Sequence, residues 1–344
     1  MRGPSRRTAV LATVAAAPLL AGGWMLQSRA QRTGPQLLDQ VMGLVSQRFV
    51  DTVDAPALFE KAARGLVKEL NDPYTELFTP KQIADFSRAT NGRYGGLGME
   101  ITETGGWVTV ARVFPNTPAE NAGIQEGDRI VQIDTQSTRG WKTTQVSNTL
   151  LGTPGTKVRV SFQRPGVAQP IANTFTRAEI HVPAVPYAIT FDGTAGYIKV
   201  DRFNESTAED VARALRKVQA EGAKGLVIDL RENPGGILEQ SIAMSNLFLK
   251  RGQEVASVRG RQGEAQTYVA TAQPLAPTIP LVVLIDQYSA SASEIVAGAL
   301  QDHDRALIVG QTSFGKGLVQ TLFPLEGGYA LKMTTAKWFT PSGR

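Results

Sequence analysis

Residues 281–293 read LVVLIDQYSASAS, and this stretch decides the fold of the carboxyl-terminal half of the chain. The continuous apolar run Leu281–Ile285 is typical of a strand that is buried on both faces. The small residues Ser289–Ser293 follow, and the apolar spacing through Leu300 predicts a helix. A buried strand that passes through a tight turn into a helix is the basic unit of an α/β fold.

The same unit recurs on both sides of this stretch. The apolar strand Gly225–Leu230 leads through Asn233–Gly236, which reads NPGG, into a helix over residues 238–249. Two more strands and a helix are expected at Ala195–Val200, Ala306–Val309 and Thr207–Ala220. Alternating strands and helices predict an α/β core over residues 181–344.

Two segments of different character precede this core. Residues 33–90 have helical spacing and contain the helix stop Asn71-Asp72-Pro73. Residues 91–180 are rich in glycine and predict a compact β domain with two helices. Its expected strands are Met99–Ile101, Trp107–Val113, Arg129–Ile133 and Lys157–Gln163, and its expected helices are Ala119–Ala122 and Val146–Leu151.

The composition limits the chemistry. The chain has 344 residues, which is enough for two or more domains. It has no cysteine, which excludes a thiol nucleophile, disulfides and cysteine-ligated metals. The two histidines, His181 and His303, argue against a histidine-rich metal site, and no cofactor is expected.

The net charge of +5 belongs to the beginning of the chain. Five of the 36 basic residues precede the first acidic residue, Asp39, which leaves 31 basic and 31 acidic residues. The body of the protein is therefore balanced, and no nucleic-acid partner is expected. Residues 8–26 carry no charge and follow three arginines, so residues 1–32 are interpreted as an export signal or a membrane anchor. We expect an exported protein, periplasmic or extracytoplasmic, that stays on the membrane if residues 8–26 are not cleaved off.

Residues 310–317, GQTSFGKG, nearly match a phosphate-binding loop. Gly317 stands where that loop needs a Ser or Thr hydroxyl for Mg²⁺. The following residues 318–322 alternate like a strand and do not open a helix. A nucleotide site is therefore not predicted.

The serines at 289, 291 and 293 lie where a buried strand gives way to a helix. A serine there sits at the positive end of the helix dipole, and the next backbone N–H is suited to binding an oxyanion. A serine that simply caps the helix is the alternative interpretation. The small residues at every position of this turn favour close passage of a substrate backbone.

A serine nucleophile needs a base. His303 lies twelve helical residues beyond Ser291, about 18 Å away, which gives little support to a Ser-His-Asp site. Lys316 is flanked by glycines, and a lysine acts as a base only when it is neutral, a state that apolar surroundings favour. Phe314, Leu318 and the strand at 306–309 are expected to provide such surroundings. A surface lysine in a glycine-rich turn is the equal alternative.

Five segments together resemble a known family. They are Leu70–Thr75 (LNDPYT), Asp229–Gly236 (DLRENPGG), Ser289–Glu294 (SASASE) with Ala297–Asp302 (AGALQD), and Phe314–Gly317 (FGKG). In combination they are similar to the carboxy-terminal processing peptidases, also called tail-specific proteases. The resemblance runs from about residue 36 to the end of the chain.

The resemblance implies a serine endopeptidase with a crotonase-like α/β core and a Ser-Lys catalytic pair. The nucleophile would be Ser291 and the base Lys316, with Gln320 orienting the lysine. The oxyanion would be bound by the N–H of Ala292 and by one N–H from Gly235 or Gly236. The sequence leaves open which of the two glycines donates.

The glycine-rich middle segment resembles the PDZ domain of this family in its circularly permuted order. Gly96, Leu97, Gly98 and Met99 stand where the carboxylate-binding loop would be. The N–H groups of such a loop capture a C-terminal carboxylate, and the following strand pairs with the peptide. The expected partners are therefore protein substrates with accessible C-terminal tails.

Family members usually continue well past residues 340–344, so a core shortened at its carboxyl end is expected. This feature favours the alternative function, a catalytically inactive protein that binds tails through its PDZ domain. Self-association into a homo-oligomer is a further expectation.

Overall fold

The computed structural model describes residues 35–261, 263 and 265–344. The expected leader, residues 1–32, lies outside this part of the chain. Two compact units are present, one ending at Leu77 and the other beginning at Phe78. Within the described residues, no helix has both the length and the apolar character needed to cross a membrane.

The first unit is helical, as its apolar spacing predicts. A helix over residues 35–48 is followed by α2 (Ala55–Lys68), and β1 (Glu76–Phe78) begins at the end of the unit. Helix α2 ends just before Asn71-Asp72-Pro73, where Asn71 adopts a left-handed conformation with φ of +53°. Asparagine tolerates this conformation better than most residues, which explains the helix stop.

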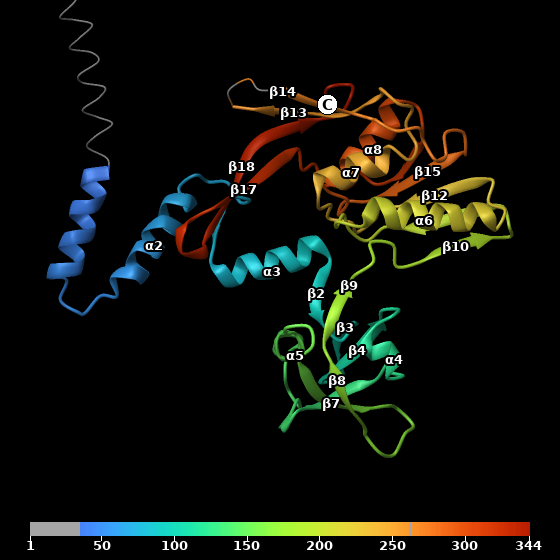
Figure 1. Ribbon diagram of the computed structural model, residues 1–344. Helices are drawn as coiled ribbons and strands as arrows, with labels where there is room; N and C mark the ends of the chain where they lie inside the picture. The colour runs from blue at the N-terminus through green and yellow to red at the C-terminus, as the bar shows by residue number, and fades with distance from the viewer. Residues whose placement is uncertain (1–34, 262, 264) are drawn as a thin grey trace, which may run out of the picture. The chain divides into compact units, whose positions relative to one another are not determined.

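The second unit contains the α/β core (Figure 1). Its central sheet has the strand order β10-β11-β12-β15-β16, in which β10 is antiparallel to β11 and the other neighbours are parallel. The strands are β10 (Ala188–Phe191), β11 (Ala195–Lys199), β12 (Gly225–Asp229), β15 (Leu281–Ile285) and β16 (Leu307–Gly310). Helices α6 (Thr207–Ala220), α7 (Leu238–Ser245) and α8 (Ala292–Asp302) share one hydrophobic core with this sheet.

The four parallel strands fix where a site can form. The loops after β11, β12, β15 and β16 all leave from the carboxyl ends of these strands, so they meet at one edge of the sheet. This edge is where open α/β sheets bind ligands. The loops that contain Gly235, Ser291 and Lys316 are three of these four.

A second, antiparallel sheet contributes the strand that follows Lys316. Its strands pair in the order β17-β18-β13-β14. They are β17 (Leu318–Pro324), β18 (Ala330–Phe339), β13 (Glu254–Gly260) and β14 (Ala265–Val269). Trp338 of β18 is buried in the same core as the central sheet.

The glycine-rich middle segment, expected to be a PDZ domain, forms a β structure of its own (Figure 1). Its antiparallel sheet has the order β3-β4-β5-β7-β8, with β6 paired to β5, and α4 and α5 accompany it. The elements are β3 (Met99–Thr104), β4 (Trp107–Val113), α4 (Pro118–Asn121), β5 (Arg129–Ile133), β6 (Gln136–Ser137), α5 (Thr143–Leu150), β7 (Lys157–Gln163) and β8 (Ile171–Thr176). Its hydrophobic core shares no residue with the core around the central sheet.

A two-stranded stem connects the PDZ domain to the rest of the unit. Helix α3 (Pro80–Asn91) leads into β2 (Arg93–Gly96), which pairs antiparallel with β9 (Ala178–His181). At the base of the stem, the Val182 N–H donates to the Gly92 carbonyl at 2.7 Å. The chain therefore enters and leaves the PDZ domain side by side, which confirms the expected insertion.

The sequence expectations and the structure differ in a few places. Helix α7 ends at Ser245 instead of continuing to residue 249. Strands β1, β2, β6, β8, β9, β10, β13, β14 and β18 were not expected from the sequence. Most of them are short or rich in polar residues, so they lack the apolar run that identifies a buried strand.

Candidate active site

Ser291 is the residue at which the chain turns from strand β15 into helix α8. It is the N-cap of α8 and has φ of +55° and ψ of −113°. A residue with a Cβ avoids this region, and such strained positions concentrate at functional sites. The sharp turn resembles the strained strand-to-helix turn that exposes a nucleophilic serine in other hydrolases.

The other two serines of the cluster hold the turn in place. The Ser289 hydroxyl donates to the Leu230 carbonyl at 2.8 Å, and the Ser293 hydroxyl donates to the Asn233 carbonyl at 3.0 Å. Both side chains are buried, whereas Ser291 is half-buried. The flanking serines therefore fasten the turn to the loop after β12.

Glu294 joins the serine turn to the loop that carries Lys316. Its Oε2 accepts from the N–H groups of Ser291 at 2.7 Å and Lys316 at 2.9 Å. Its Oε1 accepts from the Gly315 N–H at 2.6 Å and the Ser313 hydroxyl at 2.7 Å. One carboxylate thus fixes the backbone at both Ser291 and Lys316.

The sequence contains a signal for this role that its functional interpretation missed. Ser291 and Glu294 have the S-x-x-E spacing of a capping box at the start of an apolar helix. A capping glutamate normally satisfies its own helix terminus. Here the same side chain also reaches a second loop, which only the tertiary structure reveals.

The surroundings of Lys316 differ from those expected. Phe314 is 57% exposed, and the edge strand β16 leaves Leu307 65% and Val309 41% exposed, so these residues do not form an apolar enclosure. The expectation was wrong because β16 has a neighbour on only one side. The buried neighbour of Lys316 is instead Trp338, whose Nε1 donates to the Lys316 carbonyl at 2.9 Å.

The loop after β12 lies directly against the serine turn. A Cβ built on Gly235 would lie 2.5 Å from the Ala290 carbonyl oxygen and 2.9 Å from the Ala292 nitrogen. Gly235 has φ of +89° and donates its N–H to the Asn233 Oδ1 at 2.9 Å. Within the described part of the chain, the N–H groups of Gly236 and Ala292 have no hydrogen-bond acceptor.

Phe203, in the loop after β11, supports this glycine pair from behind. The Phe203 N–H donates to the Gly235 carbonyl at 3.0 Å, and its carbonyl accepts from the Ile237 N–H at 2.8 Å. A Cβ on Gly236 would lie 2.1 Å from the Phe203 oxygen. Only glycine fits between Phe203 and the serine turn.

Two further residues considered for the site, Gln320 and His303, have hydrogen-bond partners in the structure. The Gln320 Nε2 on β17 donates to the Thr334 Oγ1 on β18 at 3.4 Å. His303 is the C-cap of α8, at the opposite end of the helix from Ser291, and its Nε2 lies 2.7 Å from the Glu254 carbonyl oxygen. This position gives His303 no role beside Ser291.

Asp229 organises the carboxyl end of β12. It is buried, and it accepts hydrogen bonds from the Tyr197 hydroxyl at 2.6 Å and from the Arg231 Nη2 at 2.6 Å. Burial raises the pKa of Asp229, but the hydrogen bonds from Arg231 and Tyr197 outweigh it and bring the pKa below its ordinary value. The charge of this carboxylate fixes Arg231 at the start of the loop that leads to Gly235.

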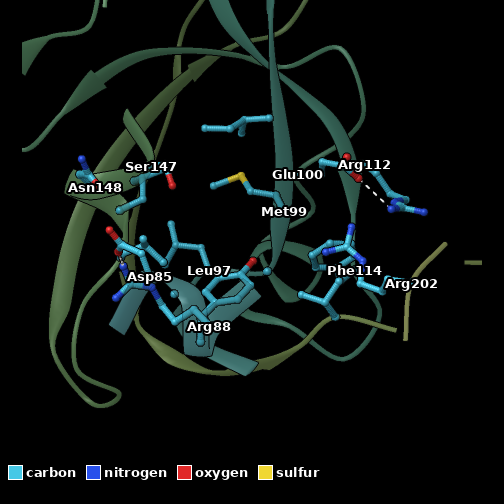
Figure 2. A pocket seen from close by; sticks show the side chains of 17 residues that line it. Asp85, Arg88, Leu97, Met99, Glu100, Arg112, Phe114, Ser147, Asn148 and Arg202 are labelled. Atoms are coloured by element: carbon cyan, nitrogen blue, oxygen red, sulfur yellow. Dashed lines mark hydrogen bonds and ion pairs between the residues drawn. The ribbon is translucent and has the colours of Figure 1, made fainter. Parts of the chain in front are cut away.

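The groove of the PDZ domain is a cavity of about 460 Å³ between β3 and α5 (Figure 2). Gly96, Leu97, Gly98 and Met99, the residues expected to bind peptide, all line it. Gly98 has φ of +87° and donates no hydrogen bond to any described residue, and neither does the Leu97 N–H. Two neighbouring N–H groups are therefore available to a ligand.

An α/β core with a serine at a strained strand-to-helix turn, together with an inserted PDZ domain, defines the class of PDZ-containing serine peptidases. Family models agree: residues 194–344 match peptidase family S41, and residues 109–164 match the PDZ domain. The chain belongs to the carboxy-terminal processing proteases of this family. It is a serine-type carboxy-terminal processing endopeptidase by this membership.

Individual relatives support the assignment. A carboxy-terminal-processing protease of Bartonella bacilliformis is 39% identical over 87% of this chain and 69% of its own length. The carboxy-terminal processing protease CtpA of Bacillus subtilis is 32% identical over 98% of this chain and 72% of its own length. The solved structure of a photosystem II D1 C-terminal processing protease is 31% identical, with a TM-score of 0.51 over 88% of this chain and 82% of that structure.

Proposed function

We propose that this protein captures the C-terminal tails of substrate proteins in its PDZ groove and cleaves them with a Ser291–Lys316 pair. Neutral Lys316 accepts the Ser291 hydroxyl proton as the Ser291 Oγ attacks a substrate carbonyl carbon. The protonated lysine then returns the proton to the leaving amine, and Lys316 activates water to hydrolyse the acyl-enzyme. Gln320 orients the lysine side chain.

The observation that carries this proposal is the Glu294 carboxylate, which accepts hydrogen bonds from the N–H groups of both Ser291 and Lys316. A nucleophile and a base must be held together for general-base catalysis, and a shared anchor on their backbones does this. The strained φ of Ser291 supports the choice of the middle serine.

The oxyanion site follows from the hydrogen bonds of the loop after β12. Because the Gly235 N–H donates to Asn233, we assign the second oxyanion donor to Gly236, beside the N–H of Ala292. Gly235 contributes its lack of a side chain, which lets this loop approach the serine turn. Two N–H groups aimed at one position stabilise the negative charge of a tetrahedral intermediate.

Tail recognition rests on the PDZ groove. The available N–H groups of Leu97 and Gly98 suit a C-terminal carboxylate, and β3 is placed to pair with an extended peptide. The apolar lining residues Met99, Leu150 and Leu151 favour an apolar last side chain. Substrates with exposed, apolar C-terminal ends are therefore expected.

The test is cleavage of a protein with an unstructured apolar tail by the purified full chain. Ser291→Ala and Lys316→Ala are expected to abolish cleavage while the melting temperature changes little. Lys337→Ala, which removes an exposed lysine from β18, is the matched control and should keep normal activity. Normal cleavage by either site variant would contradict the proposal.

Export is proposed on the leader sequence alone. The mature protein would lie outside the cytoplasm, either released or attached by residues 8–26. Fractionation of the producing cells, with sequencing of the mature N-terminus, tests this. Recovery of the full-length chain in the cytoplasmic fraction would contradict it.

A further inference from the structure

The charged side chains that line the PDZ groove do not balance. They are Asp85, Arg88, Glu100, Arg112 and Arg202 (Figure 2). Arg88 forms an ion pair with Asp85, and the Arg112 Nη2 lies 2.7 Å from the Glu100 Oε2. These two pairs account for both acidic residues and leave the charge of Arg202 uncompensated.

Arg202 does not belong to the PDZ domain. It lies in the loop between β11 and α6 of the α/β core, directly before Phe203. Its side chain has no hydrogen-bond or ion-pair partner among the described residues, and its buried Nε atom is one of those left unsatisfied. A buried guanidinium nitrogen without an acceptor carries a free-energy cost that an anionic ligand would remove.

The position of Arg202 relates it to the carboxylate-binding loop. In Figure 2 it lies on the same side of the groove as Phe114 and Arg112, opposite Ser147 and Asn148. The Phe114 N–H donates to the Gly98 carbonyl at 2.9 Å, so this side of the groove is adjacent to the glycine loop. Arg202 therefore lies on the side of the groove where Phe114 is hydrogen-bonded to Gly98 of the carboxylate-binding loop.

The Tyr94 hydroxyl is a further hydrogen-bond donor of this region. Tyr94 lines the groove, and burial, with a smaller contribution from Glu100, raises its pKa to about 12. Its hydroxyl therefore stays protonated at neutral pH, and it has no acceptor within the described part of the chain. The unsatisfied Arg202 Nε and the N–H groups of Leu97 and Gly98 suit a ligand that accepts hydrogen bonds and carries negative charge.

We propose that Arg202 of the α/β core binds the C-terminal carboxylate of the substrate tail in the PDZ groove. This inference rests on the proposed tail recognition and adds a side-chain ligand from outside the PDZ domain. The carboxylate, rather than an acidic side chain, is the ligand because the neighbouring donors are consecutive backbone N–H groups beside an apolar lining. The guanidinium supplies the counter-charge that backbone groups lack.

The experiment measures peptide binding by the full chain in a Ser291→Ala background, which prevents cleavage. The probe is a fluorescein-labelled hexapeptide of uncharged residues ending in leucine, used as the free acid and as the C-terminal amide. We expect Arg202→Gln to weaken binding of the acid about tenfold or more and to leave binding of the amide unchanged. Arg202→Lys should recover part of the affinity because it restores the charge but not the fork of donors.

Arg216→Gln is the matched control, because it removes an exposed arginine that lies outside the groove. It should bind the acid as tightly as the parent does. Equal melting temperatures of the Arg202 and Arg216 variants would show that lost affinity is not lost folding. If Arg202→Gln unfolds, the folded Arg202→Lys variant takes its place in the test. Its affinity for the acid should then lie below that of the parent, and an affinity equal to the parent's would contradict the proposal.

Three outcomes would overturn the proposal. If Arg202→Gln preferred the acid peptide over the amide peptide as strongly as the parent does, the core arginine would not be a ligand of the carboxylate. If Arg202→Gln weakened the binding only of an amide peptide that contains an internal glutamate, Arg202 would bind an acidic side chain of the substrate and not its terminal carboxylate. Equal binding of acid and amide by the parent would instead refute tail recognition itself, so the two failures are distinguishable.

Discussion

The carboxylate of Glu294 accepts hydrogen bonds from residues up to 22 positions away along the chain. Three of its four donors are backbone N–H groups, which cannot be replaced by mutation of a side chain. Charge-assisted bonds of this kind are stronger than neutral ones. The relative placement of Ser291 and Lys316 therefore depends on the ionised form of this one residue.

Glu294→Gln is expected to lower kcat about 10- to 100-fold with a small change in KM. The amide keeps one acceptor oxygen but turns an NH₂ group toward N–H donors, so the two loops separate. Steady-state cleavage of a tailed substrate measures the effect. Ser313→Ala, which removes one of the four donors and leaves the carboxylate, should keep most of the activity. Activity of Glu294→Gln within about twofold of the parent would contradict this role.

Alanine substitutions at Gly235 and Gly252 distinguish the effect of backbone strain from the effect of a steric clash. Both have φ of +89°, but a Cβ on Gly252 would meet nothing within 4 Å, whereas one on Gly235 would press on Ala290 and Ala292. We expect Gly252→Ala to cost about 1–2 kcal/mol of stability with normal turnover. Gly235→Ala should in addition lose at least about 100-fold in kcat, because the oxyanion loop moves away from Ser291. Equal kinetics of the two variants would refute the close approach.

At the scale of elements, Asp229 connects the ends of β11 and β12 through Tyr197 and Arg231. The pKa of this carboxyl is lower in the folded protein than its ordinary value. A lowered carboxyl pKa stabilises the folded state above the ordinary pKa, and this stabilisation is lost as pH falls through the folded pKa. The contribution should therefore be constant near neutral pH and disappear in acid.

Asp229→Asn is expected to lower the free energy of unfolding by about 1–3 kcal/mol at neutral pH. The difference from the parent should shrink as pH falls below about 4, because the parent then loses the same ion pair. Urea unfolding at several pH values measures it. A difference that does not depend on pH would show that the charge of Asp229 contributes nothing.

The elements that the sequence predicted best have a clear apolar pattern, which is a continuous run in β15, alternation in β4 and helical spacing in α6. Strands β15 and β4 match their expected bounds, and so does helix α6. Strands β13 and β18 were missed because their residues alternate between small, polar and apolar types, and their pairing is set by partners far away in the chain. Local pattern carries little information about such strands.

The candidate site was predictable in its residue types but not in its connections. The serine turn, the lysine and the glycine pair each have a local signature. The hydrogen bonds from Gly315 and Lys316 to Glu294 depend on the approach of two loops, as does the exposure of Phe314. The unpaired charge of Arg202 likewise appears only when the PDZ groove and the loop after β11 are placed together.

At the scale of the whole molecule, two hydrophobic cores without a shared residue predict two unfolding steps. Calorimetry of the full Ser291→Ala chain should resolve a transition of the PDZ domain from that of the α/β core. A free-acid tail peptide should raise the PDZ transition more than the core transition, since a ligand stabilises the unit that binds it. The amide peptide is the control. One transition that shifts as a whole would show that the two cores unfold together.

The stem of β2 and β9 has a consequence for how such enzymes diversify. Because Val182 donates to Gly92, the ends of the inserted domain meet within one hydrogen bond, and the α/β core closes behind it. A domain attached in this way can be exchanged. Residues 93–181 could be replaced by another domain whose two termini lie equally close together, without breaking the central sheet of the α/β core. Substrate choice and peptide-bond chemistry could then evolve, or be engineered, at separate rates in one chain.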